Sequence, residues 1–166
     1  RAFALRDYPA GGLALVAALA GVAVSLSLRI DPTGNPDSLA FLAIARSLLA
    51  GLGFRYQEPL IPGVDLLAFR APGYPAFVAG GMALGGTGVV IAIQGALNGL
   101  SAVLVGGIAK DLHSTRAGWI AFALRAIWPF AWICSGQLMS ETLYEFLCVL
   151  AAWLAVRAAV RRRIPW

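Results

Sequence analysis

The chain has 166 residues, of which 60% are hydrophobic and only 13% are charged, and its mean hydropathy is +0.78. Soluble domains average roughly 45–50% apolar and about 25% charged residues, so this composition excludes an ordinary soluble protein and indicates an integral membrane protein. Because a spanning helix uses about 20 residues, the chain has room for four or five membrane segments and one loop. It has no room for a separate soluble catalytic domain.

The formal net charge is +5, but the basic residues are scattered among apolar runs. They form no basic patch interleaved with exposed aromatic residues, which argues against a nucleic-acid partner. Cys134 and Cys148 lie inside apolar segments and lack a Cys-x-x-Cys spacing. We therefore interpret both as small buried hydrophobic residues. The sequence indicates no cofactor and no metal site, although assistance by a divalent metal is left open.

The first transmembrane helix is predicted at residues 9–29. Residues 8–28 carry no charge and are long enough to cross the hydrocarbon core. A cleavable signal peptide is the competing interpretation, but no small-residue cleavage site is evident near Arg29. We therefore expect a retained helix.

Residues 30–70 form the one extended polar stretch. Within it, Pro36 and Asp37 have the positions of a helix start, with proline at the first helical residue and an acid in the first turn. The helix predicted over 38–50 is too short to span the membrane and mixes apolar with polar residues, which favours a position in the membrane interface. The remainder, 54–70, is broken by prolines and glycine and is predicted as a loop.

The next apolar stretch breaks at the glycine-rich residues 85–88. Before the break, residues 72–86 are too few for the roughly 30 Å core and predict a half-span. After it, full spans are predicted at 88–109, 117–135 and 140–158. The expected fold is a single all-α membrane domain with about four transmembrane helices, one half-span and an interfacial helix in the first outer loop.

The arginines predict the orientation of this domain. If the half-span enters and returns on one face, the N-terminus, the 110–116 turn and the 157–163 tail share a side and hold eight basic residues against two acids. Residues 30–70 hold three arginines and four acids. Because basic loops stay in the cytoplasm, we expect a multi-pass protein of the bacterial inner membrane with residues 30–70 on the periplasmic side.

Three charged residues on the predicted outer face are candidates for chemistry. Asp37 feels the positive end of its helix, which favours an ionised carboxylate that can accept a proton or bind a cation. Arg70 precedes a rigid turn into the membrane and can grip a phosphate through paired hydrogen bonds. Glu141 lies near the start of the last predicted helix, in a position similar to that of Asp37 in its helix. The alternatives are helix capping for the acids and snorkelling toward lipid headgroups for the arginine.

Four polar residues lie within predicted spans and are expected to have structural roles. Charges at this depth are costly and usually pair, so we predict an ion pair between Arg125 and Glu145. Gln94 and Asn98 are spaced by four residues on one helix face and are expected to bond neighbouring helices.

The order of short motifs over residues 30–145 is similar to a known family. The motifs are, in chain order, Pro36-Asp37-Ser38, Leu49-Ala-Gly-Leu-Gly-Phe54, Phe69-Arg-Ala-Pro-Gly-Tyr-Pro-Ala-Phe77, Gln94 and Ser135-Gly-Gln-Leu-Met-Ser-Glu-Thr-Leu-Tyr144. Together they resemble the N-terminal part of bacterial membrane glycosyltransferases of the GT-C superfamily. These are relatives of the protein O-mannosyltransferases and of the enzyme that adds aminoarabinose to lipid A.

The resemblance implies transfer of a sugar, with inversion, from a polyprenyl-phosphate carrier to an acceptor on the outer face. It implies that Asp37 is the catalytic base and Glu141 a second active-site acid. It also implies that Arg70, with Tyr74 in the same motif, faces the carrier phosphate.

The chain is much shorter than the enzymes of this family, so two interpretations stay open. It is either the N-terminal membrane portion of such an enzyme or a non-catalytic transmembrane accessory subunit of a larger membrane complex derived from one. The set Asp37, Arg70 and Glu141 favours the enzyme, because a packing subunit does not need it. The closing basic cluster and Trp166 suit a membrane-surface terminus and favour the short subunit. The expected partners are membrane lipids, a polyprenyl-phosphate sugar and other subunits.

Overall fold

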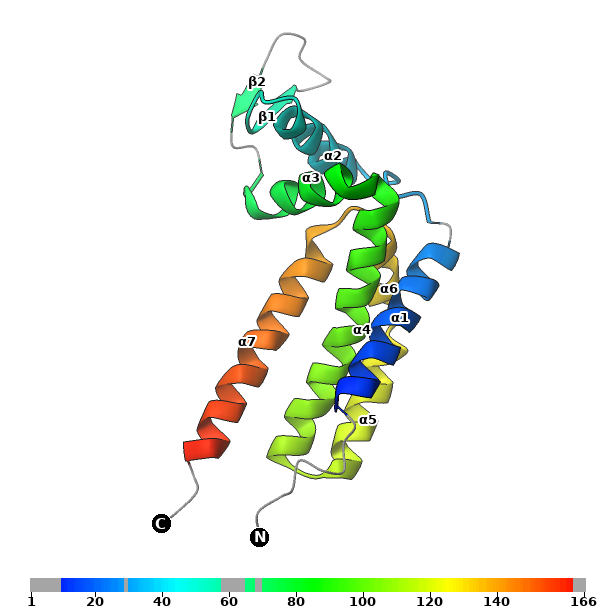
Figure 1. Cartoon of the computed structure of the whole chain (residues 1–166), viewed down its shortest axis with the longest axis vertical. Helices are drawn as coiled ribbons and strands as arrows, with labels where there is room; N and C mark the ends of the chain where they lie inside the picture. Colours follow the sequence, from blue (N-terminus) through cyan, green and yellow to red (C-terminus); the bar gives the residue numbers. More distant parts are fainter. Residues whose placement is uncertain (1–9, 29, 58–64, 68–69, 163–166) are drawn as a thin grey trace.

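The computed structural model describes residues 10–28, 30–57, 65–67 and 70–162. In these ranges seven helices account for most of the chain, which confirms the all-α class (Figure 1). The elements are α1 (Ala10–Ser27), α2 (Pro36–Leu49), β1 (Arg55–Gln57), β2 (Asp65–Leu67), α3 (Gly73–Gly85), α4 (Thr87–Leu112), α5 (Thr115–Ala126), α6 (Pro129–Gly136) and α7 (Ser140–Arg162).

Two helices, α4 and α7, are long and apolar enough to cross a membrane. The pair α5 and α6 is bent by 51° and provides a third candidate if both halves form one broken span. The apolar part of α1, Gly12–Ser27, is shorter than these. The protein thus has the helices of a membrane protein, and the fourth crossing, predicted at 9–29, stays a prediction. Residues 9 and 29 lie outside the described residues.

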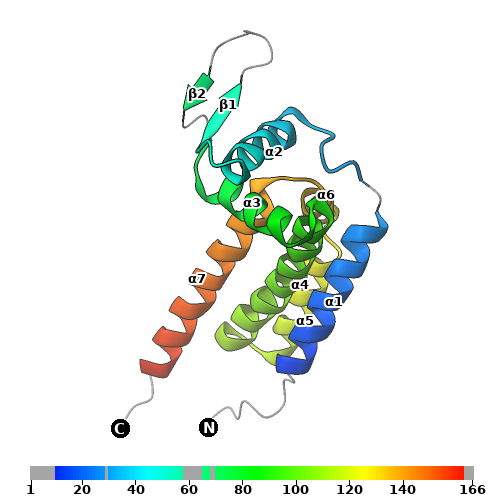
Figure 2. The same cartoon turned by 45° about the horizontal axis from the view of Figure 1, so that its top comes forward.

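The long helices form a bundle with one capped end (Figures 1 and 2). The start of α1, the connection from α4 to α5 and the end of α7 lie at the uncapped end. Helices α2 and α3 lie across the other end, together with the antiparallel pair β1–β2. Because the start of α1 and the end of α7 lie at the same end, the chain passes along the bundle an even number of times. The side of the membrane stays a prediction, and the basic residues of segments 1–9 and 163–166 lie outside the described residues.

The predicted half-span corresponds to α3, which lies across the bundle instead of along it (Figure 1). The chain turns from α3 into α4 at Gly86, whose φ of 83° is in the left-handed region that glycine adopts without strain. On its inner face α3 buries Tyr74 and Val78 against Phe41 and Ala45 of α2. These contacts make α2 and α3 one layer over the bundle.

The start of α2 agrees with the sequence prediction. The Asn35 side chain accepts a hydrogen bond from the backbone N–H of Ser38 at 2.9 Å, and Pro36 takes the first helical position. Asp37 is in the first turn, close to the unpaired N–H groups of the helix end. The carboxylate therefore has a defined position at the capped end.

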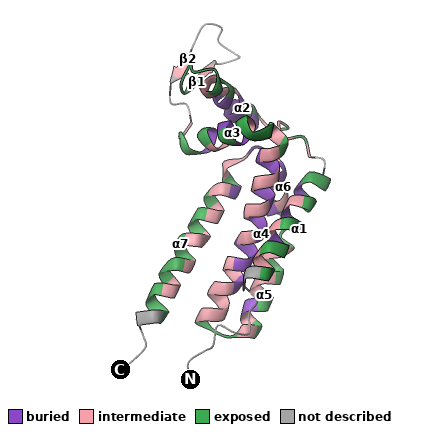
Figure 3. Cartoon of the chain, in the orientation of Figure 1, coloured by how far each residue is buried: buried purple, intermediate pink, exposed green. Residues whose placement is uncertain are grey.

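Helix α4 is the centre of the bundle and its most buried long helix (Figure 3). It meets α1 backbone to backbone: a Cβ added at Gly21 would lie 2.0 Å from the Gly95 carbonyl oxygen, and one at Gly99 would lie 2.0 Å from that of Ala17. The pairs Ala17–Gly21 and Gly95–Gly99 both have the small-xxx-small spacing of close membrane helix contacts. This contact holds α1 against the bundle.

Helix α7 is the least buried of the long helices (Figure 3). Cys148 lies on its exposed side, whereas Cys134 on α6 is buried. The prediction that both cysteines are buried was therefore wrong for Cys148. The physical reason is that α7 contacts the bundle along one side only, so apolar residues such as Leu147 and Leu154 on its other side are exposed.

Candidate functional site

The structure brings two of the predicted outer-face residues into direct contact. An Arg70 Nη2–H donates to Asp37 Oδ1, which forms an ion pair between the segment before α3 and the first turn of α2. The Arg70 guanidinium also lies 5.6 Å from the centre of the Phe41 ring, within the range of a cation–π contact. The side chains of Arg70 and Asp37 are 33% and 52% exposed. The pair is therefore accessible from outside.

A pocket of about 420 Å³ lies next to Arg70. It is an open pocket between α2, α3 and the first turns of α7, and its lining includes Phe41, Arg70, Tyr74, Ser140, Leu143 and Tyr144. Most of this lining is apolar or aromatic, with Arg70 as its cation. A guanidinium beside an apolar pocket suits a ligand with an anionic end and a hydrocarbon body.

Tyr74 lines this pocket, but its hydroxyl hydrogen is already engaged. The hydroxyl donates to Gln94 Oε1, and the side chain is almost completely buried. Burial, with a smaller contribution from the charge of Glu141, raises the pKa of the Tyr74 phenol far above its usual value. The phenol therefore stays protonated, and a phosphate in the pocket would have to compete with Gln94 for that hydrogen.

Gln94 joins α4 to the end of α6. Its Nε2 donates to the Gln137 carbonyl at 2.6 Å and to the Ser135 carbonyl at 3.1 Å, and its Oε1 accepts from Tyr74. The prediction of a helix-bonding role thus agrees with the structure, although the donors bond main-chain carbonyls and not a neighbouring side chain. One fully buried side chain connects the α2–α3 layer to the bundle beneath it.

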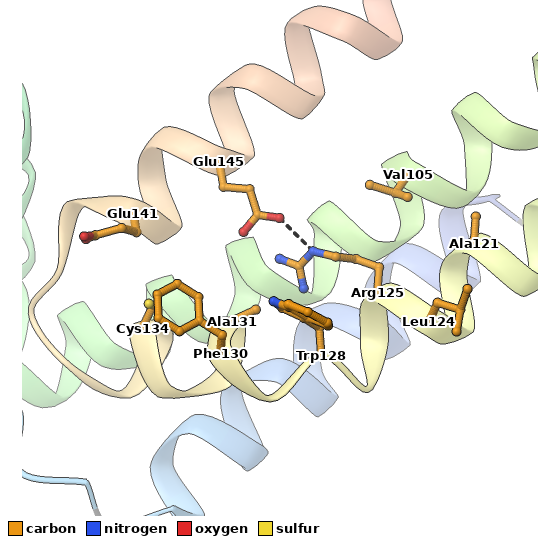
Figure 4. A pocket seen from close by; sticks show the side chains of 10 residues that line it. All are labelled: Val105, Ala121, Leu124, Arg125, Trp128, Phe130, Ala131, Cys134, Glu141 and Glu145. Atoms are coloured by element: carbon orange, nitrogen blue, oxygen red, sulfur yellow. Dashed lines mark hydrogen bonds and ion pairs between the residues drawn. The ribbon is translucent and has the colours of Figure 1, made fainter.

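A second set of charges lies deeper in the bundle, as predicted. Arg125 Nε donates to Glu145 Oε1 at 2.7 Å (Figure 4). Arg125 Nη2 donates to Asn98 Oδ1 at 2.8 Å. The ion pair was predicted from the sequence, whereas the contact between Asn98 and Arg125 was missed. The four-residue spacing of Gln94 and Asn98 placed both on one face of α4 but did not identify which helix each would meet.

A cavity of about 490 Å³, open to the outside, lies beside this ion pair, between the α5–α6 break and α7. Glu141 lines it together with Glu145 and Arg125 (Figure 4). Arg70 and Tyr74 line the other pocket. The two acids that the resemblance assigns to one active site thus lie differently: Asp37 contacts Arg70, whereas Glu141 lines the deeper cavity.

The described part of the chain contains no group of three or more His, Cys, Asp or Glu side chains that could hold a metal ion.

Comparisons with models of protein families, with curated proteins and with solved structures found no match. The resemblance to GT-C glycosyltransferases therefore stays a prediction from the order of the sequence motifs.

Proposed function

We propose that the chain is the N-terminal membrane portion of a GT-C-like glycosyltransferase that uses a polyprenyl-phosphate-linked sugar. The observation that carries this proposal is the contact between Arg70 and Asp37 beside a largely apolar pocket. A polyprenyl phosphate has a phosphate for the guanidinium and a hydrocarbon chain for the apolar walls. The proposed base is thus one hydrogen bond away from the proposed phosphate-binding residue.

The proposed reaction follows from these two charges. The Asp37 carboxylate takes the proton of an acceptor hydroxyl, whose oxygen attacks the anomeric carbon of the sugar. The bond from that carbon to the carrier phosphate breaks, and the phosphate leaves with the electron pair. Arg70 stabilises the charge on the leaving phosphate. Because a bound phosphate draws the guanidinium toward itself, it also releases the Asp37 carboxylate for the acceptor.

The test separates binding from transfer. Membranes carrying the full protein are supplied with undecaprenyl phosphate to measure binding, and with undecaprenyl-phosphate mannose or aminoarabinose to measure transfer. Arg70→Gln should weaken binding of undecaprenyl phosphate about tenfold, because it removes a charge-assisted bidentate contact. Asp37→Asn should retain binding but lower transfer at least about 100-fold, the usual contribution of a general base.

Asp31→Asn is the matched control, because Asp31 is an exposed acid at the same end that lines neither described pocket. It should leave binding and transfer unchanged. Transfer at the wild-type rate by the Asp37→Asn variant would remove Asp37 as the base.

The second candidate function is the non-catalytic accessory subunit, which the exposure of α7 favours. None of the most apolar 18-residue window of α7 is buried within the chain, so the helix offers a long face to another membrane protein. An intact mass near 17.4 kDa for the native chain, together with co-purification in a larger complex, would support this function. It would also contradict independent glycosyl transfer.

A further inference from the structure

The deeper cavity carries an inference that is independent of glycosyl transfer. The cavity lies between α7 and the broken pair α5–α6, which are both candidate membrane spans. Its walls are mainly apolar, with aromatic rings of Trp128 and Phe130 among them. A cavity of this size, about 490 Å³, is within the range of sites for small organic ligands.

The polar groups of the cavity are ordered along its length. Glu141 is in the first turn of α7, at the end of the bundle that α2 and α3 cover. Glu145 and Arg125 follow one turn deeper, and Val105 and Leu124 lie beyond them (Figure 4). From the capped end inward, the lining therefore changes from an acid to an ion pair and then to aliphatic side chains.

One donor in this series lacks an acceptor. Arg125 is only 11% exposed, and its Nη1 has no hydrogen-bond partner among the residues that the structure describes, although Nε and Nη2 are both bonded. A buried donor without a partner is costly. An acceptor oxygen bound in the cavity would remove that cost.

The charged residues of the cavity limit the kind of ligand that can supply this acceptor oxygen. Arg125 contributes one positive charge, and Glu141 and Glu145 contribute two negative charges, so the cavity is net negative. Glu145 is already paired with Arg125, whereas no ion pair of Glu141 is found in the described ranges. A simple anion would be repelled. A ligand that carries both a cationic group and an anionic oxygen can pair with Glu141 through the first and accept a hydrogen bond from Arg125 through the second.

We propose that this cavity binds a zwitterionic phospholipid with a primary amine, of the phosphatidylethanolamine type. Its phosphate oxygen accepts from Arg125 Nη1, its ammonium group pairs with Glu141, and its acyl chains lie along Leu124 and the aliphatic wall. The order of groups in such a lipid, from ammonium through phosphate to hydrocarbon, is the order of the lining from the capped end inward. The lipid thus fills the space between α7 and the rest of the bundle.

The test measures lipid preference with purified, delipidated full-length protein in detergent micelles. Dioleoyl phosphatidylethanolamine, phosphatidylcholine and phosphatidylglycerol are added separately, and the bound fraction is measured by native mass spectrometry. We expect phosphatidylethanolamine to bind about fivefold more tightly than phosphatidylcholine, whose quaternary ammonium cannot donate a hydrogen bond to Glu141. Phosphatidylglycerol should bind most weakly, because it lacks the cation.

Glu141→Gln should abolish the preference for phosphatidylethanolamine over phosphatidylcholine. Asp31→Asn is again the control, since it removes an exposed acid outside the cavity while its side-chain oxygen can still accept from Thr33. If the wild-type protein binds the three lipids equally, this result alone overturns the proposal. Preferential binding of phosphatidylglycerol would overturn it in favour of a plain anion site, and an unchanged preference in Glu141→Gln would exclude Glu141 as the ammonium partner.

Discussion

Arg125 illustrates how a cation is accommodated inside an apolar bundle. Its side chain is nearly buried, and it shares its hydrogens between the carboxylate of Glu145 and the amide oxygen of Asn98. The two partners come from α7 and α4, so the arginine joins three separate helices. The Arg125 side chain is therefore one of the links between α7 and the rest of the bundle.

Removing this cation should destabilise the protein. Arg125→Leu leaves Glu145 without its ion-pair partner, and because Glu145 is 40% exposed we expect a loss of about 1–2 kcal/mol, less than for a fully buried pair. Thermal unfolding in detergent measures the change. The double variant Arg125→Leu with Glu145→Leu should recover part of the loss, and a single variant as stable as the wild type would contradict a stabilising pair.

The sequence was sufficient to predict the ion pair of Arg125 and Glu145 but not the hydrogen bond from Arg125 to Asn98. A charge within an apolar segment needs a partner, and Glu145 was the acid one turn into the next span. Asn98 could not be assigned in the same way, because its contact depends on the rotation of α4 about its axis. That rotation is set by the packing of α4 against α1, α5 and α7 together.

At the scale of elements, the span predicted at 117–135 is divided into α5 and α6. Pro129 has no N–H to donate to Arg125 one turn earlier, so the helix ends and restarts with a 51° bend. Trp132 Nε1 donates to the Ala126 carbonyl at 2.8 Å, which satisfies a backbone group that the break exposes. The sequence showed the proline but not how large the bend would be.

The contact between α1 and α4 depends on glycines that the sequence interpretation did not use, although Gly95 and Gly99 carry the small-xxx-small spacing. Gly99→Ala should lower stability by about 2 kcal/mol, because its Cβ would lie 2.0 Å from the Ala17 carbonyl oxygen and the helices must separate. Gly80→Ala on α3 is the control, since nothing lies within 4 Å of its added Cβ. The free energy of unfolding of both variants is measured by denaturant titration in detergent. Equal free energies for Gly99→Ala and Gly80→Ala would refute the close contact.

At the scale of the whole molecule, the apolar runs and their glycine and proline breaks were enough to predict the helices, because each helix must satisfy its own backbone in a membrane. They placed Asp37 and Arg70 on one face of the membrane but were not enough to predict that the two side chains are in contact. Asp37 and Arg70 meet because α3 lies across the bundle, and that direction depends on the burial of Tyr74 and Val78 against α2. The direction of α3, unlike the need of an intramembrane charge for a partner, has no signal in a single sequence.

The orientation of the molecule can be tested with single cysteines. In a background with Cys134 and Cys148 replaced, Thr33→Cys samples the α1–α2 connection and His113→Cys samples the α4–α5 connection. If residues 30–70 face the periplasm, a membrane-impermeant maleimide should label the first in intact spheroplasts and the second only after permeabilisation. Labelling of both positions from one side would contradict the four crossings.

The Gln94 amide has a consequence for how the chain is made. It bonds carbonyls of residues 135 and 137, which leave the ribosome about forty residues after it. Until they arrive, α4 carries a polar amide that a hydrocarbon environment cannot satisfy. Helix α4 should therefore stay beside the insertion machinery or in contact with water, and it should enter the lipid together with α6. We therefore expect the insertion of α4 to depend on the synthesis of α6.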